Sequence, residues 1–426
     1  MSSGLMFLAF IVFMLVGLPI FASLGLSSFL YLIFSDSLPL ITMIKTMTEG
    51  LDSFTLLAIP FFILAGMIMN ESGMTTRIFA FAQSIVGYLP GGLGHVNIVT
   101  SIIFAGMSGS AIADAGGTGA MEAKAMIENG YDEEYSIGLT AASSLIGPII
   151  PPSIPMLVYA VIASTSVAKL FAGGIIPGLL MGLTMMVMNH ILALKRNYPR
   201  NIGFSLKEIA TTAIHAFWGL FAPLILLGGI FGGVFTPTEA AVIAIGYSLI
   251  IGGLVYKGLT WKKIIRILFN ACESTVSVTL ILASSAIFAW ILAYEGTPQR
   301  IAGLLLSITN NPTLLCLIIT VVMLIVGTFM EAGAAMVILL PVILPVVDLV
   351  GIDRVHLGII VVLSLMIGLL TPPVGLVLFV LGKTMDVPVS RVIKGTMPFL
   401  IPLVLVSIII AMVPSLSLWL PSMLGG

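Results

Sequence analysis

The chain has 426 residues, of which 59% are hydrophobic and only 8% charged, and its formal net charge is −1. Soluble globular proteins carry about 25% charged residues, so this composition excludes a cytosolic or secreted enzyme. Apolar runs of about 20 residues, long enough to cross a bilayer, fill most of the chain and leave no room for a separate water-soluble domain. The balance of 17 basic and 18 acidic residues argues against nucleic acid as a partner.

The N-terminal third begins with an apolar run at 5–34, which lacks the positive residues that open a secretory signal. We expect a retained membrane helix there. A more polar stretch follows at 35–52, with apolar residues at helical spacing between the charges. Such a pattern is typical of an amphipathic helix in the membrane interface, so we interpret 35–52 as an interfacial arm.

Two interruptions then divide the apolar sequence. The first is the Gly- and Ser-rich stretch that starts at Gly106, which predicts a helical hairpin over 95–128. The second contains Pro151-Pro152, and it predicts that the segment 133–165 is a transmembrane helix broken at its centre. Each proline removes a backbone donor and clashes with the preceding turn, so the pair cannot lie within a continuous helix.

The same order of features recurs after a linker at 195–225. A second interfacial arm is expected at 257–273, a second hairpin at 313–348 and a second broken helix at 354–386. Irregular backbone at membrane depth persists only where protein or a wet cavity satisfies its N–H and C=O groups. The alternative, kinked helices that bind no ligand, is disfavoured because the interruptions occupy matched places in both halves.

A constant offset relates the two halves. Pro151-Pro152 recurs as Pro372-Pro373, and Gly106 recurs as Gly327 at the same separation (372 − 151 = 327 − 106 = 221). We therefore expect two structural repeats, 1–194 and 226–426. Five crossings in each repeat would insert the second repeat inverted. The predicted fold is an all-α polytopic membrane protein with two inverted repeats, each containing a re-entrant hairpin and a broken transmembrane helix, an arrangement that points to a secondary transporter.

Few polar side chains interrupt these segments. Glu331 is the only charge in its apolar run, and an ionisable residue at that depth is a candidate functional group. Asp114, Ser108, Ser110, Ser153 and Thr371 are further candidates. The alternatives remain open: the carboxyls cap a turn or are protonated, and the hydroxyl residues only pack between helices.

Other activities lack a sequence signature. No nucleotide-binding loop occurs, since Gly382-Lys383-Thr384 lacks the preceding glycine that such a loop requires, so an ion gradient is the expected energy source. We find no acid–base pair in the sequence that would indicate an intramembrane enzyme, so we do not expect enzymatic activity. A passive anion channel is the main alternative, but channels usually build their carbonyl rings from subunit symmetry around a pore.

Four stretches together resemble a known family. They are IPFFILAG from Ile59, GMSGSAIADAGGTGA from Gly106, GPIIPPS from Gly147 and TPPVG from Thr371. They resemble the large membrane subunit of tripartite ATP-independent periplasmic (TRAP) transporters across essentially the whole chain. The chain is also similar to Na⁺-coupled dicarboxylate carriers, but it has Glu331-Ala332-Gly333 where their hairpin tip has Ser-Asn-Thr.

The resemblance implies an elevator-type transporter in the bacterial inner membrane, with a transport domain that slides against a scaffold. It implies sodium symport of an organic acid: a C4-dicarboxylate, a keto acid or an acidic sugar such as sialic acid. The implied partners are a small four-helix membrane subunit, expected as a separate polypeptide, and a periplasmic substrate-binding protein that delivers the acid.

Backbone carbonyls freed at the four interruptions are oxygen ligands suited to Na⁺, so at least two Na⁺ sites are expected. The predicted Na⁺ ligands are Gly106, Ser110, Gly147 and Ile150 for one site, and Gly327, Met330, Ala332, Gly333, Leu370 and Thr371 for the other. The substrate carboxylate is expected between the two hairpin tips. The predicted substrate contacts are Ser108, Ser153, Glu331 and Thr371.

Overall fold

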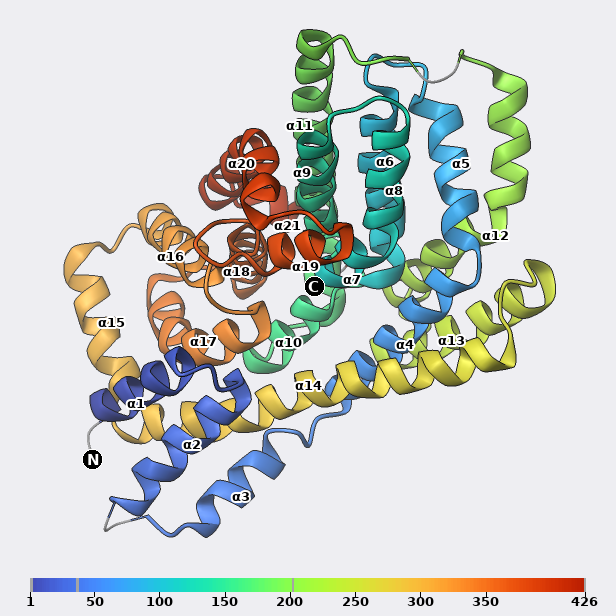
Figure 1. Cartoon of the computed structure of the whole chain (residues 1–426). Helices are drawn as coiled ribbons and strands as arrows, with labels where there is room; N and C mark the ends of the chain where they lie inside the picture. Colours follow the sequence, from blue (N-terminus) through green and yellow to red (C-terminus); the bar gives the residue numbers. More distant parts are fainter. Residues whose placement is uncertain (1–2, 36–37, 201–202, 425–426) are drawn as a thin grey trace.

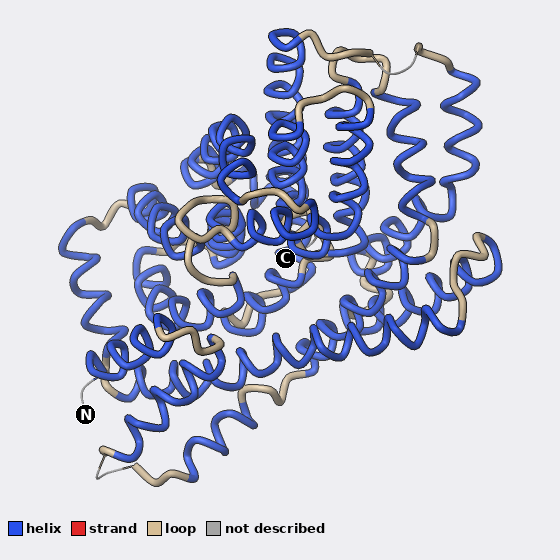
Figure 2. The backbone as a smooth tube through the Cα atoms, viewed as in Figure 1, coloured by secondary structure: helices blue, strands red, loops and turns tan. Residues whose placement is uncertain are grey.

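The computed structural model describes residues 3–35, 38–200 and 203–424, and every regular element in these ranges is helical (Figures 1 and 2). Residues 36–37 of the predicted first arm and 201–202 of the predicted linker lie outside the described residues. In chain order the α-helices are α1 (Ser3–Leu15), α2 (Ile20–Ile33), α3 (Ile41–Glu49), α4 (Ala58–Glu71), α5 (Met74–Val86), α6 (Gly92–Ser108), α7 (Ala111–Asp114), α8 (Ala120–Glu128), α9 (Glu133–Ser143), α10 (Ile154–Ile162), α11 (Val167–Arg196), α12 (Leu206–Phe231), α13 (Pro237–Ile250), α14 (Trp261–Tyr294), α15 (Thr297–Ile308), α16 (Pro312–Gly327), α17 (Ala332–Val350), α18 (Arg354–Gly368), α19 (Leu376–Met385), α20 (Val389–Met412) and α21 (Ser415–Met423).

Seven helices in the described part of the chain are long and apolar enough to cross a bilayer. They are Phe54–Glu71, Val167–Arg196, Leu206–Phe231, Pro237–Val255, Trp261–Tyr294, Ala332–Val350 and Val389–Met412. Many side chains on their outer faces are apolar and exposed, as lipid contact requires. The prediction of an all-α polytopic membrane protein is confirmed.

The two predicted arms differ in the structure. In the first half α3 is a separate helix that ends at Glu49, because Gly50 and the residues after it interrupt the helix before α4. In the second half the stretch 257–273 does not form a separate arm. It enters α14, which continues for 34 residues because no glycine or proline lies between Trp261 and Tyr294.

The predicted linker 195–225 is also mostly helical where it is described. α11 continues to Arg196, and α12 begins at Leu206 after Ser205, whose side chain accepts a hydrogen bond from the Glu208 N–H. A serine at this position satisfies one of the free N–H groups at a helix start. The non-helical connection is therefore shorter than the composition of the stretch indicated.

Helix α14 is the longest element, and it extends along one side of the molecule (Figure 1). It contacts α2, α3 and α4, and it also reaches α17. On the opposite side α6, α8, α9 and α11 stand beside one another (Figure 1). α4 contacts α6 of the first predicted hairpin, and α14 contacts α17 of the second, so both predicted hairpins lie against this pair of helices.

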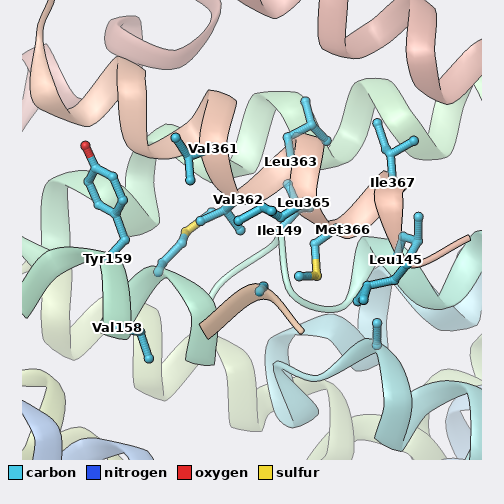
Figure 3. Packing of buried hydrophobic residues seen from close by; sticks show 14 of the residues in the cluster. Leu145, Ile149, Val158, Tyr159, Val361, Val362, Leu363, Leu365, Met366 and Ile367 are labelled. Atoms are coloured by element: carbon cyan, nitrogen blue, oxygen red, sulfur yellow. The ribbon is translucent and has the colours of Figure 1, made fainter. Parts of the chain in front are cut away.

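The interior between the interruptions is densely apolar. Figure 3 shows α18 residues from Val361 to Ile367 packed near Tyr159 of α10 and near Leu145 and Ile149, which come just before the first proline pair. The Tyr159 hydroxyl donates to the Arg354 carbonyl at 2.7 Å, which joins the start of α18 to α10. This packing holds the two broken segments against each other.

Candidate functional site

The first hairpin turns at Gly109, which ends α6 with a φ of 63°. Glycine suits this left-handed conformation because it has no Cβ to clash with the backbone. Ser110 then caps α7, with its side chain accepting from the Ala113 N–H at 3.4 Å. The Ser110 N–H in turn donates to the Ser108 hydroxyl at 3.4 Å. The chain returns through a π-helical segment at Ala115–Gly119 into α8. The first tip (residues 108–114) therefore presents the hydroxyls of Ser108 and Ser110 and the carboxylate of Asp114.

The second hairpin turns between α16 and α17, and Glu331 is the residue that caps α17. Its Oε2 accepts from the Gly333 N–H at 2.8 Å and from the Ala334 N–H at 3.3 Å. The partial positive charge at a helix N-terminus stabilises a carboxylate in this position. The start of α17 is therefore already occupied by the chain's own acidic side chain, and the second tip (residues 328–334) presents a carboxylate.

Both proline pairs interrupt their helices, as predicted. In the first half α9 and a short helical turn end at Ile146, and α10 begins at Ile154. In the second half α18 ends at Gly368 and α19 begins at Leu376. The Pro151-Pro152 and Pro372-Pro373 bonds are both cis.

Each tip makes a backbone contact with its own break. The Gly109 carbonyl accepts from the Ile154 N–H at 3.4 Å, and the Thr328 carbonyl accepts from the Gly375 N–H at 3.1 Å. The structure thus brings together the two interruptions of each half, which are well separated in the sequence.

A cavity of about 360 Å³ lies between the two tips. Its walls come from α4, α6, α7, α10, α14 and α18, with Glu331 contributed by the second tip. The polar residues that line it are Asn70, Ser108, Ser110, Asp114, Ser274, Ser277 and Glu331. None of its lining residues is Lys, Arg or His, so any bound anion depends on hydroxyl and amide donors or on a metal cation.

The predicted substrate contacts separate into two pairs. Ser108 and Glu331 line the cavity. Ser153 does not: it is fully buried, donates to the Pro148 carbonyl and caps α10 by accepting from the Met156 N–H at 3.2 Å. Thr371 is also absent from the lining, and its hydroxyl donates to the Ile367 carbonyl at 3.0 Å. In this structure Ser153 and Thr371 stabilise the backbone of the two breaks.

The predicted Na⁺ ligands of the first half gather around the first tip and break. Ser110 lines the cavity, whereas Gly106, Gly147 and Ile150 are buried behind it. A Cβ on Gly147 would lie 2.1 Å from Asp114 Oδ2, so only glycine lets the carboxylate approach the break this closely.

The predicted ligands of the second half lie around the second tip and break. They are Gly327, Met330, Ala332, Gly333, Leu370 and Thr371, all of which are buried except the partly buried Thr371. Gly327 packs directly on the second broken helix, since a Cβ on Gly368 would lie 2.5 Å from the Gly327 Cα. In the described residues no group of three or more His, Cys, Asp or Glu side chains lies close enough together to hold a metal ion.

From the sequence Asp114 was a candidate whose role stayed open, and Asn70, Ser274 and Ser277 were not predicted to belong to the site. Asp114 is only 5% exposed, and both of its carboxylate oxygens lack hydrogen-bond partners among the described residues. A charged residue inside a Gly-rich interruption was the signal for it. The other three line the cavity from α4 and α14, where no motif marked them.

A family model described as "Tripartite ATP-independent periplasmic transporter, DctM component" matches residues 7–416. The chain is 43% identical over 410 residues to the sialic acid TRAP transporter large permease protein SiaM of Vibrio cholerae, covering 96% of both chains. It is 41% identical over 421 residues to the sialic acid TRAP transporter permease protein SiaT of Haemophilus influenzae, covering 98% of this chain and 68% of that protein. It is 38% identical over 403 residues to the C4-dicarboxylate TRAP transporter large permease protein DctM of Pseudomonas aeruginosa, covering 95% and 94%.

Solved structures show a similar fold at low sequence identity. The YdaH transporter of Alcanivorax borkumensis superposes with a TM-score of 0.64 at 15% identity, covering 90% of this chain and 89% of that one. MtrF of Neisseria gonorrhoeae superposes with a TM-score of 0.62 at 12% identity, covering 89% and 83%. The family model and the permease relatives extend over nearly the whole chain, and both interruptions lie within the matched region. The chain belongs to the DctM family of TRAP transporters, as a large membrane subunit.

Proposed function

We propose that this subunit carries an organic acid across the bacterial inner membrane in symport with Na⁺. The cavity between the two hairpin tips is the observation that carries the proposal, because hydroxyl groups, two carboxylates and backbone interruptions surround one small-molecule-sized space. Relatives named for sialic acid, C4-dicarboxylates and 2,3-diketo-L-gulonate support an acid as the substrate.

Two Na⁺ sites are proposed, one beside each tip. The first would use backbone oxygens around Ser110 and the Gly147–Ile150 break, with Asp114 supplying negative charge nearby. The second would use oxygens around Met330 and the Leu370–Thr371 break. Bound Na⁺ would offset the two carboxylates that line a cavity without basic side chains, and it would let an anionic substrate approach them.

The proposed architecture is a pair of inverted repeats. The hairpin α6–α8 corresponds to α16–α17, and the broken pair α9/α10 corresponds to α18/α19, with the two cis proline pairs at the repeat offset (372 − 151 = 221). In the proposed elevator, hairpins and broken helices form the transport domain. Helices such as α4 and α14, which contact the hairpins, form the scaffold.

The proposed partners follow from the tripartite family. A separate small four-helix membrane subunit would pack on the exposed apolar surface of the scaffold, and a periplasmic binding protein would deliver the acid. Energy would come from the ion gradient, without nucleotide.

The test is uptake into proteoliposomes that contain this chain with its small subunit, with N-acetylneuraminate and succinate as probes. We expect uptake to require an inward Na⁺ gradient and the binding protein, with a Hill coefficient for Na⁺ above one. Unchanged uptake on a proton gradient alone would refute Na⁺ coupling. Counterflow separates a carrier from a passive channel, since only a carrier exchanges labelled for unlabelled acid against the label's own gradient.

A further inference from the structure

A buried hydrogen-bonded network joins the first hairpin to the first broken helix. Asn97 Nδ2 of α6 donates to the Thr140 hydroxyl of α9 at 2.8 Å, and the Ser143 hydroxyl donates to Asn97 Oδ1 at 2.6 Å. These three side chains, the Asn97 network, are at most 1% exposed. Thr140 donates in turn to the Ser136 carbonyl at 2.8 Å. Because Asn97 is buried, both ends of its amide group depend on α9 for hydrogen bonds.

The corresponding positions of the second half cannot form this network. The repeat offset relates its members to Ile318, Val361 and Ser364 (318 − 97 = 361 − 140 = 364 − 143 = 221). Isoleucine and valine have no hydrogen-bonding group in their side chains. Ser364 is fully buried, and its hydroxyl lacks a hydrogen-bond partner among the described residues. The Asn97 network is therefore specific to the first half.

The second half fixes its hairpin by a different contact. There α16 and α18 cross at Gly327 and Gly368, and a Cβ on Gly368 would lie 2.5 Å from the Gly327 Cα. The corresponding glycines of the first half, Gly106 and Gly147, do not approach each other in this way. A Cβ on Gly106 would first meet Pro223 of α12, at 2.7 Å. In the first half the Asn97 network thus takes the place of the glycine crossing between hairpin and broken helix.

The network lies directly before the proposed first Na⁺ site. The Gly147–Ile150 break, whose backbone oxygens are proposed ligands, begins four residues after Ser143 (147 − 143 = 4). The hairpin contacts the α10 side of this break through the Gly109 carbonyl, which accepts from the Ile154 N–H at 3.4 Å. The α9 side is joined to the hairpin through Asn97. Ligands from two segments bind one ion well only when the distance between the segments is held.

We infer that Asn97 is a positioning residue for the first Na⁺ site, because it holds α6 and α9 at the spacing that lets the hairpin and the break bind one ion together. This rests on the proposed function, in which Na⁺ binds beside the first tip. Asn97 does not line the cavity, so it acts through the backbone and not by contact with the acid. Loss of the network should therefore weaken Na⁺ binding and largely retain transport at saturating Na⁺.

The test replaces the network by apolar side chains of similar shape. Asn97→Leu combined with Thr140→Val removes both partners of the central hydrogen bond, and Ser143 keeps the Thr140 carbonyl as an acceptor at 3.1 Å. No buried polar side chain of the network is then left unpaired, so the double variant should remain folded. Its melting temperature is measured in the purified complex with the small subunit, in NaCl and in choline chloride at equal ionic strength.

We expect the NaCl concentration that gives half of the Na⁺-dependent rise in melting temperature to increase about tenfold, as when groups that hold metal ligands in place are lost. The melting temperature in choline chloride should change little. In proteoliposomes the probe is N-acetylneuraminate or succinate, whichever the unmodified complex transports. The Na⁺ concentration for half-maximal uptake should rise by a similar factor, whereas the rate at saturating Na⁺ should be largely retained.

Ser143→Ala and Ser364→Ala form a matched pair at corresponding positions of the two halves. Ser143→Ala removes one hydrogen bond to Asn97 and should raise the half-maximal NaCl concentration a few-fold. Ser364→Ala removes a hydroxyl without a partner among the described residues and should leave that concentration unchanged.

Unchanged Na⁺ dependence in the double variant, with or without a lower melting temperature in choline chloride, would overturn the inference while Na⁺ symport stands. Equal shifts in Ser143→Ala and Ser364→Ala would overturn it as well. If the double variant does not fold, Ser143→Ala decides, and unchanged Na⁺ dependence in that variant counts against the inference. If NaCl neither stabilises the unmodified complex nor drives its uptake, the proposed function fails with it.

Discussion

Ser110 and Glu331 occupy corresponding positions in the two halves of the chain (331 − 110 = 221). Each caps the helix that follows a hairpin tip and accepts hydrogen bonds from its backbone. One cap is neutral and the other is acidic. The first tip contributes its cavity carboxylate from Asp114 instead, at a position that corresponds to Ala335 in the second half (335 − 114 = 221), so each hairpin places one acidic group at a different point of the same cavity.

The glycines of the two breaks show the same divergence. Gly147 and Gly368 are related by the same offset (368 − 147 = 221). Gly147 lies against the Asp114 carboxylate, and Gly368 lies against the backbone of Gly327. In the first half the missing Cβ makes room for a charged side chain, and in the second half it makes room for a close crossing of α16 and α18.

The largest effect is expected for Gly368→Ala compared with Gly147→Ala. A Cβ on Gly368 would lie 2.5 Å from the Gly327 Cα and 2.6 Å from its carbonyl carbon, and neither backbone atom can move without separating two helices. We expect a loss of about 3 kcal/mol or more, at the upper end of overpacking effects, with little folded complex recovered. Size-exclusion chromatography and thermal unfolding of the purified complex measure it.

Gly147→Ala should be milder, because the Asp114 side chain can rotate away from the new Cβ, and the complex should remain folded. It should instead weaken Na⁺ dependence by displacing the carboxylate. A Gly368→Ala complex as stable as the unmodified one would contradict the close crossing. Unchanged Na⁺ dependence in Gly147→Ala would show that the position of Asp114 is unimportant.

The next largest effect concerns the two caps. If Glu331 balances the charge of Na⁺ and accepts substrate hydroxyls, as we propose, Glu331→Gln should lower the initial rate of Na⁺-driven uptake by about tenfold or more. Ser110→Ala should lower it only a few-fold, since it removes one long cap contact and one neutral hydroxyl. Near-normal uptake by Glu331→Gln would mean that the carboxyl acts as a neutral donor. Uptake by Glu331→Ala equal to that of the unmodified complex would show that Glu331 has no functional role.

The smallest effect is expected for substitutions of Asp132 and Asp353, which follow the first and the second hairpin respectively (353 − 132 = 221). Asp353 caps α18 by accepting from the Val355 N–H at 2.7 Å and the His356 N–H at 3.3 Å. Asp132 makes no such cap and instead pairs with Tyr198 and Arg196. Asp353→Ala should cost about 1 kcal/mol as a lost cap. Asp132→Ala should cost about half of that or less, as a lost exposed ion pair.

The pH dependence of the Asp132 contribution has a definite sign. Hydrogen bonds from the Tyr198 hydroxyl and the Arg196 guanidinium hold the pKa of Asp132 below its usual range. A depressed carboxyl pKa contributes stability that is fully present above the unfolded-state pKa of about 3.9 and lost as the pH falls through the folded value. The difference in melting temperature between Asp132→Ala and the unmodified complex should therefore stay constant from pH 8 to pH 6. A change across that interval would show that another group is responsible.

Local sequence was sufficient for the helical class, for both helix interruptions and for the positions of the tips. Proline pairs and Gly-rich stretches act within a single turn of backbone, so their effects do not depend on distant residues. The constant offset between the halves was equally visible, because it needs only the order of the residues. The predicted interfacial arm at 257–273 runs on into α14, because no glycine or proline follows it before Tyr294.

Only the tertiary structure decided which polar residues share the cavity. Ser153 and Ser108 both lie at a predicted interruption. Ser153 forms hydrogen bonds with the backbone of its own break, whereas Ser108 lines the cavity. Asn70, Ser274 and Ser277 line it because α4 and α14 pass the hairpins, and the composition of those helices does not reveal this. Helix interruptions arise from backbone geometry within a single turn. A binding cavity arises from the packing of segments that lie far apart in the chain, such as those that carry Asn70 and Ser274, and is therefore specified only by the fold as a whole.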